Sequence, residues 1–96
     1  MRTLSFRVTG LVQHVWFRGW TQMTAQELGL CGWVRNLPDG SVAGQVQARE
    51  DSDTGRERLA RFVELLHHGP PSARVVRVET ELHELPEAFE GFQVRR

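Results

Sequence analysis

Apolar and polar residues alternate at the start of the chain and then change to a helical spacing. Between residues 3 and 9 every second residue is apolar, which predicts a strand with one buried face. After a glycine and a short loop, apolar residues recur at helical spacing, and Gly29 occupies a position that often follows a helix. We therefore predict a first strand at 3–9 and a helix at about 18–28.

Two further strands joined by a tight turn are predicted next. The segments 31–36 and 41–48 have strand patterns. Between them lie Pro38, which restricts φ, and the hairpin signal Asp39-Gly40. The two strands are therefore expected to be antiparallel neighbours.

The second half of the chain predicts one more helix and two strands. Four apolar residues recur at helical spacing: Leu59, Phe62, Val63 and Leu66. Thr54 and Glu57 have the spacing of a capping box, and Gly69-Pro70-Pro71 is a stop signal. Strands follow at 74–82 and 92–95. The apolar face of the longer one is expected to consist of Val76, Val78, Thr80 and Leu82.

The predicted order is β-α-β-β-α-β with a short extra C-terminal strand. It is typical of an α+β sandwich of the ferredoxin-like type, in which two helices cover one face of an antiparallel sheet. A length of 96 residues fits a single domain over 1–96. Right-handed crossovers make the first two strands parallel. The loop after the first strand and Asn36 then lie at one sheet edge, ~10 Å apart if the third strand separates them.

Charge and cysteine content restrict the partners. Twelve basic residues balance twelve acidic ones, so the chain as a whole attracts neither nucleic acid nor an anionic membrane. Ala43, Gln45 and Gln47, the expected outward positions of the third strand, are not aromatic, which argues against a nucleic-acid partner. Cys31 is the only cysteine, so no intramolecular disulfide forms and a reducing, cytoplasmic location is expected. No apolar run approaches the ~20 residues of a membrane span.

The loop before the first helix is the strongest candidate for a binding site. Backbone N–H groups at a helix start have no partner within the helix, and the helix dipole makes this end positive. Arg18 adds a permanently charged guanidinium, whose paired N–H donors match the oxygens of a phosphoryl group. We therefore predict a phosphoryl-binding loop that uses mainly the backbone N–H groups of Leu11, Val12, Gln13, His14, Val15, Trp16, Phe17 and Arg18.

Arg18 and Asn36 each have a simpler interpretation. An arginine at a helix start is usually a solvated surface charge, and an asparagine before a Pro-Asp-Gly turn usually serves the turn. Their joint placement at one sheet edge, beside the loop, favours a functional site instead. Trp16 is expected to be partly exposed near the loop. Three other aromatic residues are expected in the core: Phe17, Trp20 and Trp33.

Four segments resemble sequence signatures of the acylphosphatases. They are Val8-x-Gly10-x-Val12-Gln13-x-Val15-x-Phe17-Arg18, Gly32-Trp33-Val34-Arg35-Asn36-x-x-x-Gly40-x-Val42, Gly69-Pro70-Pro71-x-Ala73-x-Val75 and Gly91-Phe92-x-Val94-Arg95-Arg96. The resemblance implies hydrolysis of the carboxyl–phosphate bond of acyl phosphates to a carboxylate and inorganic phosphate, without metal or cofactor. It also implies that Arg18 and Asn36 are the catalytic residues and that the backbone of 11–18 holds the phosphate.

The chemistry of these residues agrees with that implication. The Asn36 amide has no proton that titrates near neutral pH, so its role is to align an attacking water in line with the leaving group. The leaving carboxylate has a conjugate acid with a pKa of about 4 and departs without a general acid. A small-molecule acyl phosphate is the expected partner, inorganic phosphate the product, and the protein is expected to be a monomer.

Two positions depart from the family pattern. His14 stands where the family's loop usually has glycine, and Ala48 replaces a glycine at the end of a strand far from the site. Histidine tolerates a positive φ better than most residues, so we expect the loop to keep its shape. The alternative is a diverged, non-catalytic anion-binding module of the same fold. A site that recognises a phosphoryl group through the backbone and one arginine has few means of selecting the acyl group of the substrate.

Overall fold

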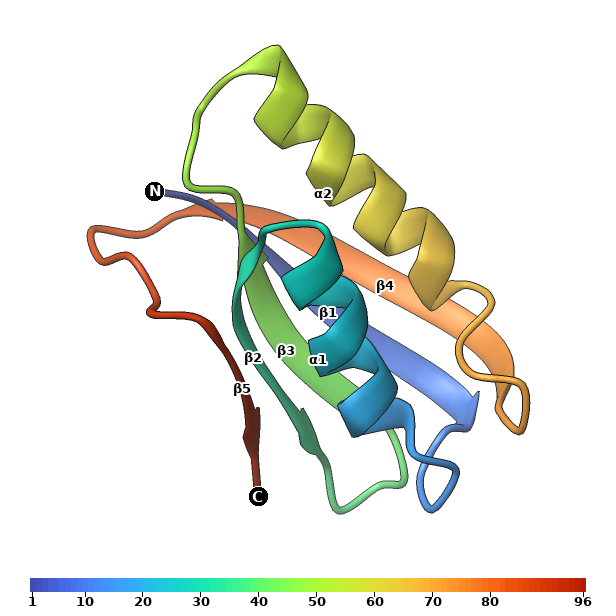
Figure 1. Cartoon of the computed structure of the whole chain (residues 1–96). Coiled ribbons are helices and arrows are strands. Elements are labelled where there is room, and N and C mark those ends of the chain that lie inside the picture. Colours follow the sequence, from blue (N-terminus) through green and yellow to red (C-terminus); the bar gives the residue numbers. More distant parts are fainter.

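Five strands and two helices make up the computed structural model, which describes all 96 residues (Figure 1). The elements are β1 (Arg2–Leu11), α1 (Phe17–Glu27), β2 (Cys31–Asn36), β3 (Val42–Gln47), α2 (Asp53–Leu66), β4 (Arg74–Glu84) and β5 (Phe92–Arg95). Their order is the one expected from the sequence. The largest difference in their bounds is β1, which begins one residue before and ends two residues after the predicted 3–9, and β4 extends two residues beyond the predicted 74–82.

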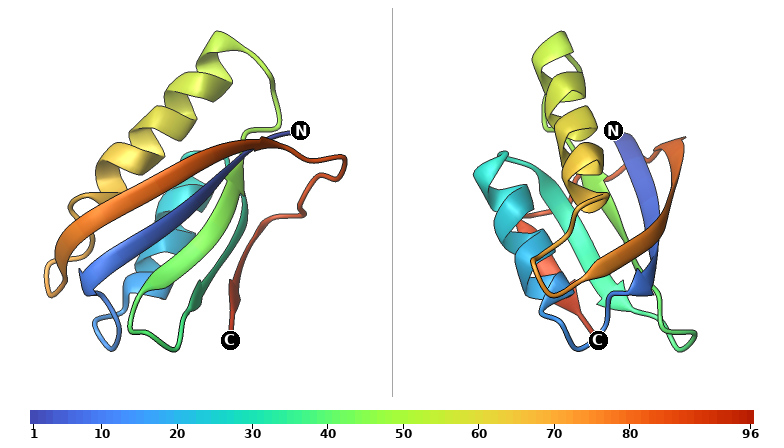
Figure 2. Two further views of the ribbon diagram at one scale, coloured as in Figure 1. Left: turned by 180° about the vertical axis from the view of Figure 1, so that it is seen from behind. Right: turned by 90° about the vertical axis from the view of Figure 1, so that its right-hand side faces the viewer.

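The strands form one sheet in the order β4-β1-β3-β2-β5 (Figure 1). β3 is antiparallel to β1 on one side and to β2 on the other, so β1 and β2 are parallel and end at the same sheet edge. β5 pairs in parallel with β2, with Gly32 opposite Phe92. The sheet is therefore mixed: the expected antiparallel pairing holds among β1 to β4 but not for β5. Residues 85–91 carry the chain across the end of the sheet to the outside of β2, where β5 runs in the direction of β2 (Figure 2).

Both helices cover the same face of the sheet, as expected for the ferredoxin-like α+β sandwich (Figure 2). The core lies between them. The helices contribute Phe17, Ala25, Leu59, Phe62 and Leu66 to it. The strands contribute Phe6, Val8, Val34, Val42, Val46 and Phe92. Because the core-facing residues alternate along β1 and β3, the register of the two central strands follows from their hydrophobic pattern.

A β-bulge ends the regular pairing of β1 with β4. Thr9 lies opposite Arg77, but Gly10 lies opposite Val75, so Val76 is the extra residue. Val76 is 76% exposed, whereas Val75 packs against the core. The expected apolar face of this strand is therefore wrong at Val76, because the bulge shifts the inward positions by one residue. Gly10 has φ 131, and a side chain there would meet the β4 backbone, with the nearest oxygen 2.2 Å from the Cβ position.

The start of α2 also differs from the prediction. Ser52 is the N-cap residue, in an extended conformation, and its side chain accepts a hydrogen bond from the backbone N–H of Gly55 at 3.2 Å. The expected capping box of Thr54 and Glu57 is wrong, because Thr54 already lies inside the first helical turn. Neither helix is long and apolar enough to cross a membrane.

Two residues on the open face of the sheet have surroundings that the sequence did not predict. Gln47 points to that face as expected but is fully buried, since residues 85–90 cover it. Its amide donates to Thr3 Oγ1 at 2.8 Å and to the Glu87 carbonyl at 3.0 Å, and its oxygen accepts from the Phe89 N–H. Trp33 also lies outside the core, beneath the guanidinium of Arg95 at 4.7 Å, so its expected core position is wrong.

Candidate active site

The loop between β1 and α1 leaves its backbone donors unused. None of the backbone N–H groups of residues 13–19 donates a hydrogen bond within the protein. Trp16, the N-cap residue of α1, makes no side-chain cap either. His14 and Trp16 have φ of 65° and 64°, the left-handed conformation that L side chains seldom adopt. His14 therefore takes the backbone shape for which a glycine is best suited, and the loop offers free donors at the positive end of a helix.

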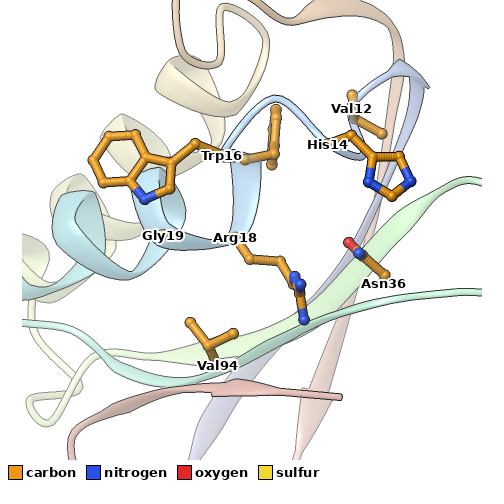
Figure 3. A pocket seen from close by; sticks show the side chains of 8 residues that line it. Val12, His14, Trp16, Arg18, Gly19, Asn36 and Val94 are labelled. Atoms are coloured by element: carbon orange, nitrogen blue, oxygen red, sulfur yellow. The ribbon is translucent and has the colours of Figure 1, made fainter.

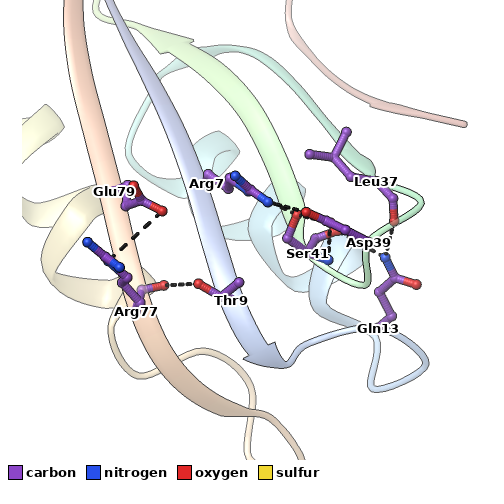
Figure 4. Close-up of polar contacts among 8 residues, drawn as sticks. All are labelled: Arg7, Thr9, Gln13, Leu37, Asp39, Ser41, Arg77 and Glu79. Carbon is purple, nitrogen blue, oxygen red and sulfur yellow. Dashed lines mark hydrogen bonds and ion pairs between the residues drawn. The ribbon is translucent and has the colours of Figure 1, made fainter.

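Gln13 ties this loop to the turn that follows Asn36 (Figure 4). Its side-chain amide donates to the carbonyl of Leu37 at 2.8 Å and to that of Ser41 at 2.9 Å. The same two residues close the turn, since the Leu37 N–H donates to the Ser41 carbonyl at 2.8 Å. One side chain from the loop thus sets its position relative to Asn36.

Asp39 reinforces the turn from the other side (Figure 4). Its carboxylate accepts hydrogen bonds from the hydroxyl and from the backbone N–H of Ser41, and it pairs with Arg7 of β1. The Ser41 hydroxyl, its N–H and then the Arg7 charge hold the pKa of the Asp39 carboxyl below its ordinary value. The turn is therefore anchored to both β1 and the loop.

A pocket of about 240 Å³ opens between the loop, the start of α1 and the ends of β2 and β5 (Figure 3). Its lining residues are Val12, His14, Trp16, Phe17, Arg18, Gly19, Asn36 and Val94. Arg18 and Asn36 come from different elements and project toward the same space, with the His14 imidazole beside Asn36 (Figure 3). The structure thus brings together the two side chains singled out from the sequence.

Arg18 is half-buried and already partly oriented. Its Nη1 donates to the backbone carbonyl of Arg95 in β5 at 3.2 Å. The Asn36 amide makes no hydrogen bond with another residue, so both its oxygen and its NH₂ are free for a ligand. A fixed cation, a free amide and unused backbone donors around one pocket suit a phosphoryl group and a water molecule.

The eight loop residues predicted from the sequence divide into two groups. Five line the pocket: Val12, His14, Trp16, Phe17 and Arg18. Three do not: Leu11 pairs with Arg74 in the sheet, Gln13 turns its side chain to the β2–β3 turn, and Val15 packs against the core. Sequence reasoning missed Gly19 and Val94 as lining residues and the side-chain role of Gln13. Val94 carries no local signal, because it reaches the pocket only through the pairing of β5 with β2.

No group of three or more His, Cys, Asp or Glu side chains is arranged to hold a metal ion. Cys31 is a free, buried thiol on β2, and burial raises its pKa. The buried position of Cys31 suits a packing role.

Comparison with known proteins identifies the family. The model of the family described as Acylphosphatase matches residues 4–94. The chain belongs to the acylphosphatase family. An acylphosphatase of Salinibacter ruber is 41% identical over 99% of this chain and 94% of its own length. The crystal structure of the acylphosphatase from Bacillus subtilis superposes with a TM-score of 0.87 at 30% identity and covers all of both chains. An acylphosphatase from Coxiella burnetii gives a TM-score of 0.84 at 34% identity, over 97% of this chain and 90% of that one.

The acylphosphatase match extends over the whole site. Residues 4–94 include the loop, Arg18, the turn after Asn36 and Val94. The resemblance noted in the four sequence signatures is thereby confirmed at the level of the family, and so is the α+β fold that it implied.

Proposed function

We propose that Arg18, Asn36 and the free backbone donors of the loop form the active site of this acylphosphatase. As a member of the family, the protein hydrolyses acyl phosphates to a carboxylate and inorganic phosphate. The observation that carries the proposal is the shared pocket, which joins one arginine, one asparagine and loop residues whose backbone N–H groups are unpaired.

The binding step uses fixed positive groups. Arg18 presents its guanidinium to two phosphoryl oxygens, and the loop donors bind the remaining ones. Because these groups are held in place before the substrate arrives, they stabilise the charge of the transition state without reorganising. The contact of Arg18 with the Arg95 carbonyl supports this assignment, since it restricts the side chain by a hydrogen bond within the protein itself.

The hydrolytic step needs no general acid in this scheme. The Asn36 oxygen accepts a hydrogen bond from the attacking water and aligns it in line with the leaving group. The water oxygen bonds to phosphorus, the bond between phosphorus and the acyl oxygen breaks, and the electron pair leaves with the carboxylate. The water's proton passes to a phosphoryl oxygen. A carboxylate with a conjugate acid of pKa about 4 is a good leaving group without protonation.

We further propose a single catalytic domain that acts as a cytoplasmic monomer without a nucleic-acid partner. All parts of the proposed site come from one chain, which supports the monomer. The zero net charge of the sequence supports the absence of nucleic acid, and the single unpaired cysteine fits a reducing compartment. The non-catalytic alternative depended on His14, which adopts a left-handed backbone conformation that would also suit a glycine, so no observation favours it.

Hydrolysis of benzoyl phosphate tests the site, followed spectrophotometrically after treatment with a chelator. The wild type is expected to turn over, with inorganic phosphate as a competitive inhibitor. Arg18→Ala is expected to lower kcat/KM by about a thousandfold or more, because an arginine on a transferring phosphoryl group has effects of that size. Asn36→Ala is expected to lower it by about a hundredfold, the cost of removing one preorganised polar contact.

Arg61→Ala is the matched control, because Arg61 is exposed on α2 and far along the chain from the pocket residues. It is expected to leave kcat/KM at the wild-type value. Undiminished activity in Asn36→Ala would contradict the water-aligning role. Binding of inorganic phosphate by a wild type that turns over no acyl phosphate would support the anion-binding module instead.

A further inference from the structure

Trp16 occupies a backbone position that suits a tryptophan poorly. N-cap positions favour residues whose side chains accept a hydrogen bond from the first helical turn, and Trp16 makes none. Its φ of 64° is also a conformation that bulky residues rarely adopt. Trp16 is nevertheless 62% exposed, so its indole gains little from packing within the protein. Backbone strain combined with an exposed aromatic ring is typical of a residue held for a ligand.

Gly19 provides the surface on which the indole rests. A Cβ at Gly19 would lie 2.1 Å from Nε1 of Trp16 and 2.7 Å from Cδ1 and Cε2. No side chain other than hydrogen is therefore compatible with the present position of the ring. The ring is held against the first turn of α1, at the wall of the pocket.

The pocket has a polar end and an apolar end (Figure 3). His14 and Asn36 lie on one side of the Arg18 guanidinium, and Trp16 and Val94 lie on the other (Figure 3). Val94 is 39% exposed and offers a second apolar surface. An acyl phosphate has the same division, with a charged phosphoryl group at one end and an acyl group at the other.

We propose that Trp16 binds the acyl group of the substrate by stacking and makes the site prefer aromatic acyl phosphates. The inference rests on the proposed function, because it needs the phosphoryl group at Arg18. The phosphoryl end orients the substrate so that the acyl group extends toward Trp16 and Val94. An aromatic acyl group gains an offset-stacked contact with the indole that an acetyl group cannot make. The site therefore has a means of selecting the acyl part that the sequence did not reveal.

Paired kinetics test this preference, with benzoyl phosphate and acetyl phosphate as the two substrates. The measured quantity is the ratio of kcat/KM for benzoyl phosphate to kcat/KM for acetyl phosphate. Trp16→Ala is expected to lower this ratio by about threefold to tenfold, the usual range for one aromatic pair. Trp16→Phe, which keeps a smaller ring, is expected to lower it less.

Gly19→Ala tests whether the position of the Trp16 indole matters, because the variant keeps the ring. The added methyl group displaces the indole, while alanine is more favourable than glycine inside a helix, so the variant is expected to fold. Its ratio is expected to fall as well, although Trp16 is intact. Met23→Ala is the matched control, because Met23 is an exposed apolar residue of α1 outside the pocket, and its ratio is expected to equal that of the wild type.

The outcomes distinguish the two proposals. If the wild type hydrolyses neither substrate, the proposed function fails and the inference with it. If the wild type hydrolyses both substrates and Trp16→Ala slows both by the same factor, only the inference is overturned. A wild-type ratio in Gly19→Ala, with thermal melts showing a folded protein, also overturns it.

Discussion

Two loops meet at the same edge of the sheet and use their backbones in opposite ways. In the turn at 37–41 the Leu37 and Gly40 N–H groups donate to backbone carbonyls and the Ser41 N–H donates to Asp39. In the neighbouring loop, no N–H group from 13 to 19 has a partner in the protein, and two residues adopt a positive φ. Satisfied hydrogen bonds make the turn a firm support for Asn36, whereas unused donors leave the loop ready for an anion.

The difference shows how a small site is built without a deep cavity. Without the turn, the loop would offer hydrogen-bond donors but no side chain to align a water molecule. Without the loop, the turn would hold Asn36 with no phosphoryl group bound beside it. Gln13 joins them, because its amide reaches from the loop to two carbonyls of the turn.

Among changes to the contacts between the loop and the turn, the largest effect is expected from Gln13→Ala, which removes the link. Each carbonyl keeps a second donor in the turn, so the free energy of unfolding is expected to fall by only about 1 kcal/mol. The loop and Asn36 then lose their relative position, and kcat/KM for benzoyl phosphate is expected to fall by about tenfold to a hundredfold. Thermal or denaturant unfolding and steady-state kinetics measure the two quantities.

Gln45→Ala is the control for this change. Gln45 also makes two side-chain hydrogen bonds, to Ser5 and from the Trp33 indole, but it lies on the open face of the sheet. A similar loss of stability with unchanged kcat/KM is expected. If Gln13→Ala kept full activity, the placement of the loop relative to Asn36 would not depend on this contact.

A smaller effect is expected from His14→Gly, which removes the side chain from the middle of the loop. Glycine relieves the strain of the positive φ, worth about 1 kcal/mol, but adds entropy to the unfolded chain worth about 0.4–1 kcal/mol. The free energy of unfolding is therefore expected to change by less than about 1 kcal/mol, and kcat/KM by less than about threefold. His67→Ala, which removes an exposed imidazole at the end of α2, is the control. A sharp slowing in His14→Gly alone would show that this imidazole acts on the ligand.

The smallest effect concerns Asp39, which stabilises the closed turn. Because its pKa is lowered in the folded protein, chiefly by the Ser41 hydroxyl, it stabilises the fold above its ordinary pKa. That contribution is lost as the pH falls through the lowered value, when the carboxylate becomes protonated. Asp39→Asn is expected to be slightly less stable than the wild type at neutral pH. The difference should disappear in acid, measured as unfolding midpoints between about pH 2 and pH 7.

Glu57→Gln is the comparison for this pH series. Glu57 is exposed on α2 and takes part in no ion pair. Its unfolding midpoint should follow that of the wild type across the pH range. A constant difference between Asp39→Asn and the wild type at every pH would contradict the proposed origin of the effect.

Local patterns in the sequence were sufficient for the order of elements, because alternating and helical spacings follow from which face of each element is buried. They failed where a distant segment decides the outcome. Val76 is turned outward by a bulge against Gly10, and Gln47 is buried by residues 85–90. Trp33 has strand spacing and apolar character, yet it lies on the open face, where Arg95 covers it. None of these neighbours is visible in a short window of sequence.

The family, the parallel arrangement of the first two strands and the placement of Arg18 and Asn36 at one edge of the sheet could all be predicted from the sequence. These follow from signatures and from the handedness of the crossovers, which depend on local chemistry and chain direction. Two features became visible only in the folded molecule: Gln13 links the loop to the turn, and Trp16 and Val94 form an apolar end of the pocket. Those contacts depend on where β5 and the β2–β3 turn lie in space, which no spacing along the chain records.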